Sequence, residues 1–301
     1  MNINGNYRKI KFAENSQIFR CPICKDEMSV YEFKDMVCNQ GHNFNIARKG
    51  YINFLLKAVK TDYDEDMFYS RTQVQESGFF DPLLEFISGS IIKRIEKNDL
   101  RKLNLLDAGC GDGSHIGQII SNLEEKVDKD IRGFGVDISK EGIVIASKQS
   151  FDILWCVADL TNLPFASRGF DVILNILSPA NYDEFHRVLK DEGILIKVVP
   201  GSAYLKELRS IFYKGTDKEE YSNEQVVKHY SKEFEIIDTS QLKYNHSIDK
   251  DELIHFIRMT PLSWKVTDDK IQRIMDIDID NISAEFLIIM GKKKNKNMSR
   301  E

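Results

Sequence analysis

The chain has 301 residues, of which 42% are hydrophobic and 30% are charged, with five cysteines and a net charge of −5. This composition suits one large or two smaller globular domains, and it excludes a disordered chain or a disulfide scaffold. No apolar run approaches the roughly 18–20 residues that a membrane span needs, and the N-terminus lacks the apolar segment of a signal peptide. We therefore expect a cytoplasmic protein without membrane contact.

Two stretches precede the main pattern of the chain. Residues 1–19 show no clear period, which predicts a flexible arm or a single peripheral strand. Residues 63–98 have helical periodicity, and Pro82 suits the first turn of a helix that begins near Asp81.

From Leu103 onward, short apolar runs alternate with helical segments, which predicts an α/β fold with a mainly parallel sheet covered on both faces. The expected strands are 103–108, 133–137, 153–157, 172–176 and 193–199, and the expected helices are 114–123, 140–150 and 182–190. Two further strands, 234–239 and 286–291, would complete the sheet in antiparallel fashion, with a helix at 250–258 and a turn at 259–264 between them.

Charge is distributed unevenly along the chain. Residues 1–60 hold ten Lys or Arg against five Asp or Glu, so they carry +5 and the remainder carries −10. Residues 292–301 carry a local +4, and their composition predicts a disordered tail. A basic front on an acidic body is typical of a nucleic-acid-docking device, but a solvated basic face remains the alternative.

Four residues near the N-terminus have the spacing of a zinc site: Cys21-x2-Cys24 and Cys38-x3-His42, with 13 residues between the pairs. Three thiolates and one imidazole close a tetrahedral coordination sphere, so this site would be structural rather than catalytic. The alternative is a pair of buried cysteines and a surface histidine. We expect the zinc module to have a core separate from that of the enzyme body and to need its metal for folding.

A segment with interleaved basic and aromatic residues follows the module. Arg48 and Lys49 lie among Phe44, Tyr51 and Phe54, a pattern that suits phosphate contact and base stacking. Packing of the three rings onto the rest of the protein explains the pattern equally well.

A glycine-rich loop at residues 106–113 follows one expected strand and precedes a helix. Gly109, Gly111 and Gly113 permit close approach of the backbone to a cofactor. The carboxylates of Asp107 and Asp112 would repel a pyrophosphate, whereas they would attract the ammonium group of S-adenosylmethionine. The loop therefore favours this methyl donor over NAD.

Two further carboxylates follow the next expected strands. Asp137 stands where the acidic residue of the second strand takes ribose hydroxyls, and Asp159 is placed to hold the adenine amino group. Each residue alone could merely cap a helix. The ordered series indicates a Rossmann-like class I methyltransferase.

At this point the chain resembles the RlmA-type methyltransferases of guanine N1 in large-subunit ribosomal RNA. Beyond the zinc quartet and the glycine loop, the similarity rests on His42-x-Phe44 and on segments 49–53, 163–165, 200–207 and 259–264, and it spans roughly residues 19–290. The resemblance implies a small zinc-binding domain before a Rossmann-like methyltransferase domain. Its implied substrate is a guanine in a hairpin loop of the 23S ribosomal RNA.

The resemblance also implies cofactors, site residues and domain limits. The zinc ligands would be Cys21, Cys24, Cys38 and His42, and donor contacts would fall on Phe80, Gly111, Asp112, Gly113, Ser114 and Tyr204. We place a zinc-binding, RNA-recognition module at residues 1–60, the methyltransferase domain at 61–291 and a basic tail at 292–301. One structural zinc ion and S-adenosylmethionine would be the cofactors, ribosomal RNA the partner, and a homodimer a compatible assembly.

The group that accepts the proton from guanine N1 is not identified by the sequence. Asn175 is the expected wall of the base pocket, and Asp183 and Glu184 are candidate acceptors, although both also suit the solvated start of a helix. Two other functions compete: a small-molecule methyltransferase with a zinc lid, and a non-catalytic zinc adaptor. The basic module argues against the first and the intact carboxylate series against the second.

Overall fold

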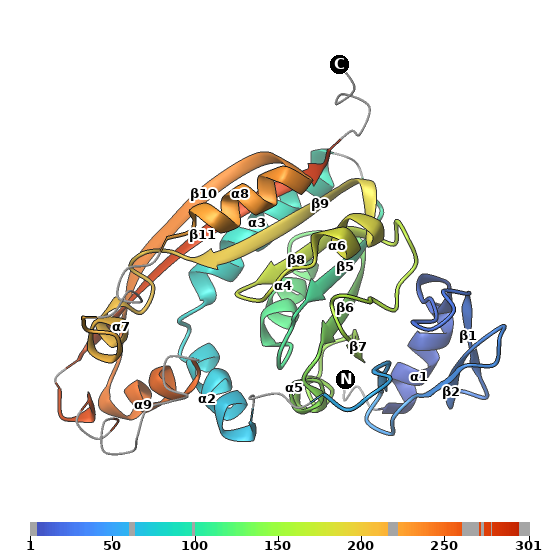
Figure 1. Ribbon diagram of the computed structural model, residues 1–301, viewed down its shortest axis with the longest axis horizontal. Helices are drawn as coiled ribbons and strands as arrows, with labels where there is room; N and C mark the ends of the chain where they lie inside the picture. The colour runs from blue at the N-terminus through green and yellow to red at the C-terminus, as the bar shows by residue number, and fades with distance from the viewer. Residues whose placement is uncertain are drawn as a thin grey trace.

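The computed structural model describes residues 5–59, 64–97, 100–215, 222–260, 271, 274–277 and 279–294. Its centre is an eight-stranded sheet with the order β10-β11-β9-β8-β5-β6-β7-β4 (Figure 1). These strands are β4 (Tyr51–Asn53), β5 (Lys102–Ala108), β6 (Asp130–Asp137), β7 (Ile153–Val157), β8 (Phe170–Ile176), β9 (Leu189–Pro200), β10 (Phe234–Ser247) and β11 (Asn281–Lys293). Strands β4 to β9 pair in parallel, whereas β11 pairs antiparallel with β9 and with β10. The predicted sheet type is confirmed.

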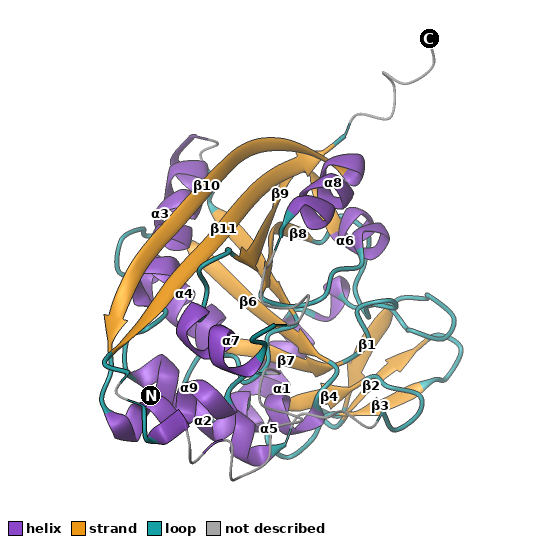
Figure 2. Cartoon of the chain, turned by 60° about the vertical axis from the view of Figure 1, so that its left-hand side comes forward, coloured by secondary structure: helices purple, strands orange, loops and turns teal. Residues whose placement is uncertain are grey.

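Three strands differ most from the expected ones. Strands β10 and β11 are 14 and 13 residues long, because they pair with each other along their whole length and β10 is half exposed rather than apolar. Figure 2 shows this long ribbon curving along one side of the sheet. Strand β4 was not expected; it pairs with β7 at the opposite edge, through Ile52 opposite Cys156.

Helices cover both faces of the sheet, as predicted. The helices of this part of the chain are α2 (Glu65–Glu76), α3 (Asp81–Lys97), α4 (Ser114–Glu124), α5 (Lys140–Ala146), α6 (Tyr182–Val188), α7 (Lys206–Phe212), α8 (Glu224–Glu233) and α9 (Lys250–Arg258). Apolar residues of α3 and α4 belong to one hydrophobic cluster, and those of α6 and α8 belong to the other. The helical stretch 63–98 is two helices, because Gly78 between them takes a left-handed conformation with φ +81°.

The N-terminal segment is a helix, α1 (Gly5–Glu14), followed by a short 3-10 turn at Ser16–Ile18, so the expectation of a flexible arm or strand is wrong. Phe12 is fully buried, and so is Arg8, whose guanidinium donates to the carbonyls of Ser147, Gln149 and Phe151 just beyond α5. Carbonyls that follow a helix end lack intrahelical partners, and a cation satisfies them well. This long-range contact orders a segment that shows no period of its own.

The zinc module contains a three-stranded sheet of β1 (Met28–Tyr31), β2 (Asp35–Cys38) and β3 (Asn43–Asn45). Its core is not separate, which corrects the sequence-based expectation. Met28 and Phe44 belong to the same hydrophobic cluster as Leu106 and Phe134 of the main sheet. A module of this size has too few apolar side chains to form a buried hydrophobic core by itself.

Some expected segments are only partly described. Residues 261–264 of the motif 259–264 lie outside the described residues, as do residues 295–301 of the basic tail. Strand β11 continues through Lys292 and Lys293, so regular structure extends into the first residues of that tail. Within the described ranges, no helix combines the length and the apolar character that crossing a membrane requires.

Candidate cofactor pocket and metal site

A cavity of about 390 Å³ lies at the carboxyl ends of the central parallel strands. Residues of the glycine loop, Asp137 at the end of β6 and residues 176–179 after β8 form one side of its lining. The rest of the lining includes residues of α2 and α4, Phe80, Tyr204 and Met259. Cofactor sites in α/β folds occupy this edge of the sheet, and the volume is within the ~300–1,000 Å³ of small-molecule sites.

The glycine loop can take its shape only with glycine at two positions. A Cβ atom on Gly109 would lie 1.8 Å from the hydroxyl oxygen of Ser178, and one on Gly113 would lie 2.3 Å from the ring of Trp155. Both residues also have positive φ angles, +89° and +78°. The loop therefore packs directly against the turn after β8 and against β7.

Asp137 is fixed by the loop and also lines the cavity. Its two carboxylate oxygens accept hydrogen bonds from the backbone N–H groups of Gly111 and Ser139, each at 2.8 Å. Burial raises the pKa of Asp137, while these two hydrogen bonds oppose the rise. The carboxylate is thus held beside the loop, where the sequence pattern predicts the ribose contact.

Asp107 is a buried carboxylate at the end of β5. Its Oδ1 atom finds no hydrogen-bond partner among the described residues. Burial, together with the charges of Asp137 and Asp112, raises the pKa of Asp107 to about 8. Asp112, in contrast, accepts hydrogen bonds from the N–H and hydroxyl groups of Ser114 and from the hydroxyl group of Thr72.

Phe80 and Tyr204 both lie in the cavity lining, where the resemblance places donor contacts. Three other expected donor contacts, Asp107, Gly113 and Asp159, are not among the described residues that line the cavity. Gly113 is the N-cap of α4. Asp159 lies two residues after β7, and its Oδ1 accepts a hydrogen bond of 2.8 Å from the backbone N–H of Thr161.

Sequence reasoning missed several charged or titratable side chains of this cavity, among them His115 and Arg71. The ring of His115 contacts Phe80 edge-on, with centroids 4.7 Å apart, and burial lowers the pKa of His115 to about 4, so the imidazole is neutral. Arg71 donates from Nε to the carbonyl of Met259 at 3.2 Å. Both residues project from helices, α4 and α2, without a local motif that would mark them.

The expected base-pocket residues are placed differently. Asn175 is fully buried, and its amide is used by the protein: Nδ2 donates to the carbonyls of Ala108 and Pro179, and Oδ1 accepts from Lys197 at 2.5 Å. This corrects the expectation that its amide forms a pocket wall. Asp183 is exposed in the first turn of α6.

Glu184, the other candidate acceptor, has a structural role. Its carboxylate forms a 2.7 Å ion pair with Arg187, and it accepts a hydrogen bond from the N–H of Leu163. Arg187 in turn donates to the carbonyls of Leu163 and Phe165. This pair holds segment 163–165 on the face of the sheet.

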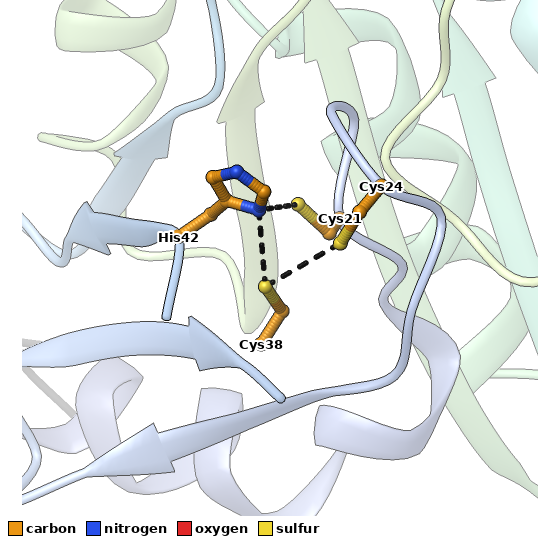
Figure 3. Close-up of side chains that lie close together, drawn as sticks. All are labelled: Cys21, Cys24, Cys38 and His42. Atoms are coloured by element: carbon orange, nitrogen blue, oxygen red, sulfur yellow. Dashed lines mark hydrogen bonds between the residues drawn. The ribbon is translucent and has the colours of Figure 1, made fainter. Parts of the chain in front are cut away.

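The four expected metal ligands come together in space (Figure 3). Their candidate ligand atoms all lie within 4.8 Å of one another. The Sγ atoms of Cys24 and Cys38 are 3.5 Å apart, and Nδ1 of His42 is 3.3 Å from Sγ of Cys38 and 3.6 Å from Sγ of Cys21. A tetrahedral zinc ion with ordinary bond lengths requires separations of roughly 3.5–3.8 Å, so the donor set fits zinc.

The aromatic residues expected to stack on RNA are buried instead. Phe44, Tyr51 and Phe54 pack in the protein interior, so the stacking interpretation of these rings is wrong and the packing alternative is confirmed. Arg48 and Lys49 between them are exposed.

Comparison with known proteins identifies the family. A family model described as "RlmA, N-terminal", a zinc ribbon, matches residues 19–60, and a "Methyltransferase domain" model matches residues 99–274. A Bacillus subtilis (strain 168) protein named as a 23S rRNA (guanine-N(1)-)-methyltransferase, YxjB, is 38% identical over 286 residues, which cover 94% of this chain and 100% of that protein. The chain belongs to the RlmA-type methyltransferase family.

Two other comparisons agree with this family and its fold. The 23S rRNA (guanine(748)-N(1))-methyltransferase of Streptomyces fradiae is 28% identical over 84% of this chain and 88% of that protein. The structure of a loganic acid methyltransferase with S-adenosylhomocysteine superposes with a TM-score of 0.51 at 11% identity, over 79% of this chain and 99% of that one. The second similarity shows the class I methyltransferase fold alone.

As a member of this family, the chain is an S-adenosylmethionine-dependent methyltransferase with a zinc ribbon. The residues of the cavity fit the donor on two structural grounds. The unpartnered Oδ1 of Asp107, which precedes the lining residues of the glycine loop but does not itself line the cavity, is a buried acceptor that suits a cationic ammonium group. In addition, the lining includes the carboxylate of Asp137, an acceptor that suits hydroxyl groups and is held in place by the N–H groups of Gly111 and Ser139.

Proposed function

We propose that this chain transfers a methyl group from S-adenosylmethionine to N1 of a guanine in a hairpin loop of 23S ribosomal RNA. The observation that carries the proposal is that the zinc ribbon and the cofactor cavity occur in one chain whose similarity to a guanine-N1 methyltransferase covers 94% of its length. A small-molecule methyltransferase would not require the ribbon.

The donor supplies a methyl group already activated on a sulfonium. We infer that Asp137 accepts hydrogen bonds from the ribose hydroxyls and that Asp107 balances the ammonium charge. Phe80, Tyr204 and the glycine loop would enclose the donor and exclude water, and Asp159 would accept from the adenine amino group. Asp137, Phe80, Tyr204 and residues of the glycine loop line the cavity, which supports their roles. Asp107 at the end of β5 and Asp159 after β7 follow from the strand pattern of the same sheet.

We propose that residues 1–60 recognise the RNA, that residues 61–291 catalyse methyl transfer, and that the basic residues 292–301 add phosphate affinity. The net charge of +5 on residues 1–60 supports the first assignment, together with two exposed rings at the turn between β1 and β2. Tyr31 and Phe33 are 62% and 53% exposed, and each is large enough to stack on an unpaired base.

The backbone of this turn supports a functional role for Phe33. Glu32 and Phe33 have φ angles of +49° and +54°, as in a type I′ hairpin turn, although such turns prefer Asn-Gly. Left-handed backbone at a residue with a large side chain costs roughly 1–2 kcal/mol. Strain of this kind is concentrated at functional sites.

The methylation test uses 23S ribosomal RNA from cells that lack the gene. Incubation with the purified protein and the donor should produce N1-methylguanine at a single hairpin position, mapped by mass spectrometry. Labelled methyl transfer to a metabolite extract but not to this RNA would overturn the proposal. The same preparation, measured by sedimentation, tests the expected homodimer, and fractionation of cells tests the expected cytoplasmic location.

The recognition test changes the two exposed rings. Tyr31→Ala/Phe33→Ala should raise the Michaelis constant for RNA about tenfold or more, since one stacked base is worth about 1–3 kcal/mol. Ile237→Ala, which removes an exposed apolar side chain from β10, is the matched control. Equal constants for both variants would assign recognition to another surface.

A further inference from the structure

A second cavity, of about 450 Å³, borders the cofactor cavity. Leu177, Ser178, Pro179 and Pro200 line both, so the turn after β8 and the end of β9 form the boundary between them. The second cavity extends from this boundary toward α6 and α8. A base bound there would lie beside the donor.

Lys197 of β9 is the charged residue of this second cavity. Its side chain is buried, with 4% of the residue exposed. The ammonium nitrogen donates to Oδ1 of Asn175 at 2.5 Å and to the carbonyl oxygen of Ser178. Since a lysine ammonium has three N–H donors, one remains for a ligand in the cavity that Lys197 lines.

The position of this ammonium is fixed by its neighbours. Asn175 holds its own amide in place by donating to the carbonyls of Ala108 at 2.6 Å and Pro179 at 2.9 Å. Lys197 is therefore anchored to the ends of β5 and β8, next to the glycine loop. A hydrogen-bond donor group held in this way needs little reorganisation when a ligand binds.

The ammonium has no anionic partner among the described residues. No Asp or Glu of the described chain lines the second cavity, where the other titratable groups are Tyr182 of α6 and His229 of α8. Burial lowers the pKa of Lys197 to about 8, so the amine is mostly charged at neutral pH. A buried cation without a counter-charge is costly, and an anion that develops beside it is correspondingly stabilised.

We propose that the second cavity receives the target guanine and that Lys197 donates a hydrogen bond to its O6 atom. This inference rests on the function proposed above. It assigns Lys197 a catalytic role, because the negative charge that appears when N1 loses its proton is shared between N1 and O6.

The transfer then balances as follows. The N1 proton passes to solvent water, and the ammonium of Lys197, which keeps its own protons, stabilises the charge on O6. The N1 lone pair forms the new bond to the methyl carbon, while the electron pair of the breaking C–S bond stays on sulfur. The products are neutral N1-methylguanine, a neutral thioether and one released proton.

The first test compares Lys197→Met and Lys197→Arg with Lys228→Met, an exposed position on α8. Removing one hydrogen-bond donor to a developing anion costs about 100-fold in rate or more. We therefore expect Lys197→Met to slow single-turnover methylation by about this factor. The affinity of Lys197→Met for S-adenosylmethionine, measured by calorimetry, should stay within about twofold of that of the parent protein. Lys197→Arg should recover at least about tenfold, whereas Lys228→Met should match the parent.

The second test changes the substrate atom instead of the protein. Replacing the target guanine with 6-thioguanine substitutes sulfur, a weak acceptor, for O6. If Lys197 contacts this atom, the ~100-fold ratio of parent to Lys197→Met should shrink to about tenfold or less, because interacting groups are non-additive. An unchanged ratio would overturn the inference and leave Lys197 a structural anchor.

These arms separate the two proposals. If the parent protein does not methylate guanine N1, the proposed function itself fails. If the parent does so but Lys197→Met is equally fast, only the assignment of Lys197 fails. If Lys197→Met no longer binds S-adenosylmethionine, the comparison of guanine with 6-thioguanine is made with Lys197→Arg and Lys197→Gln. The ratio of the methylation rates of parent and variant on each base then decides in the same way.

Discussion

Phe19 of the zinc ribbon and Phe165 of the methyltransferase body are antiparallel bridge partners, and their ring centroids lie 5.5 Å apart. Phe165 also packs edge-on against Phe134 and Phe170 of the central sheet. Aromatic pairs of this kind contribute about 0.5–1.5 kcal/mol each beyond their burial. The ribbon is thus built into the same core as the enzyme, so events at the metal should be felt throughout the protein.

Zinc should be present at one equivalent per chain, because Cys21, Cys24, Cys38 and His42 form a closed donor set. Removing it with a chelator should lower the unfolding temperature of the whole protein in one transition, since the ribbon shares its core with the body. Elemental analysis and calorimetry measure both quantities. Cys110→Ser, which changes a cysteine outside the quartet, should leave the zinc content at one equivalent. If chelation lowered the temperature of only a minor unfolding transition and left the main transition unchanged, the result would contradict a core shared by ribbon and body.

Asp137→Ala should weaken S-adenosylmethionine binding by roughly ten- to a hundred-fold. The carboxylate would lose two ribose contacts, and charge-assisted hydrogen bonds are worth about 1.5–3 kcal/mol. The variant also frees the N–H groups of Gly111 and Ser139. Asp130→Ala, at the exposed start of the same strand, is the control, and calorimetry measures both affinities. Unchanged affinity in a folded Asp137→Ala protein would limit this residue to holding the loop.

The stability of the donor-free protein should fall as the pH rises. The pKa of Asp107 is about 8 in the folded chain and about 4 when unfolded, so the folded state binds the extra proton between these values. The free energy of unfolding should therefore decrease by a few kcal/mol from pH 5 to pH 9, at about 1.4 kcal/mol per pKa unit. Asp107→Asn should reduce this loss, and Asp130→Asn should not. Denaturant titrations at both pH values provide the measurement.

Donor binding should release protons near pH 7. A cationic ammonium favours the charged form of Asp107, whose pKa must then drop on binding. Calorimetry in two buffers with different ionisation enthalpies counts the protons. A proton count that is the same for the parent and for Asp107→Asn would show that this carboxylate does not respond to the donor.

Arg48→Glu/Lys49→Glu should raise the Michaelis constant for RNA and flatten its salt dependence. Each phosphate contact that is lost lowers the log–log salt slope by roughly one unit. Donor affinity should not change, because the exposed residues 48 and 49 are absent from the described lining of the cofactor cavity. Lys93→Glu/Lys126→Glu makes the same charge change at two exposed sites, one in α3 and one just after α4. If both double variants share the salt slope of the parent, the basic front does not contact phosphate.

The zinc quartet and the glycine loop could be predicted from the sequence because local spacing determines them. Cys21 and Cys24, or Gly109 and Gly111, carry their geometric meaning within a few residues. The alternating strands and helices of residues 103–199 could also be predicted, since the period of the apolar residues indicates which faces are buried.

Other features depended on residues far apart in the chain. Helix α1 is ordered by Arg8, which binds carbonyls about 140 positions later, and β4 exists because β7 provides a free edge. No sequence pattern around Asn175 indicates that its amide oxygen accepts a hydrogen bond from Lys197, which lies 22 residues further along the chain. The donor cavity likewise acquires His115 and Arg71 from helices without a motif.

The sequence by itself thus determined the reaction class, the metal ligands and the mainly parallel character of the sheet, because these follow from short-range spacing and periodicity. Only the tertiary structure decided which rings are buried, which are left on the surface, and where the ammonium of Lys197 lies. Burial and hydrogen-bond partnership are properties of long-range packing, and the side chains that compete for each position meet only in the folded chain.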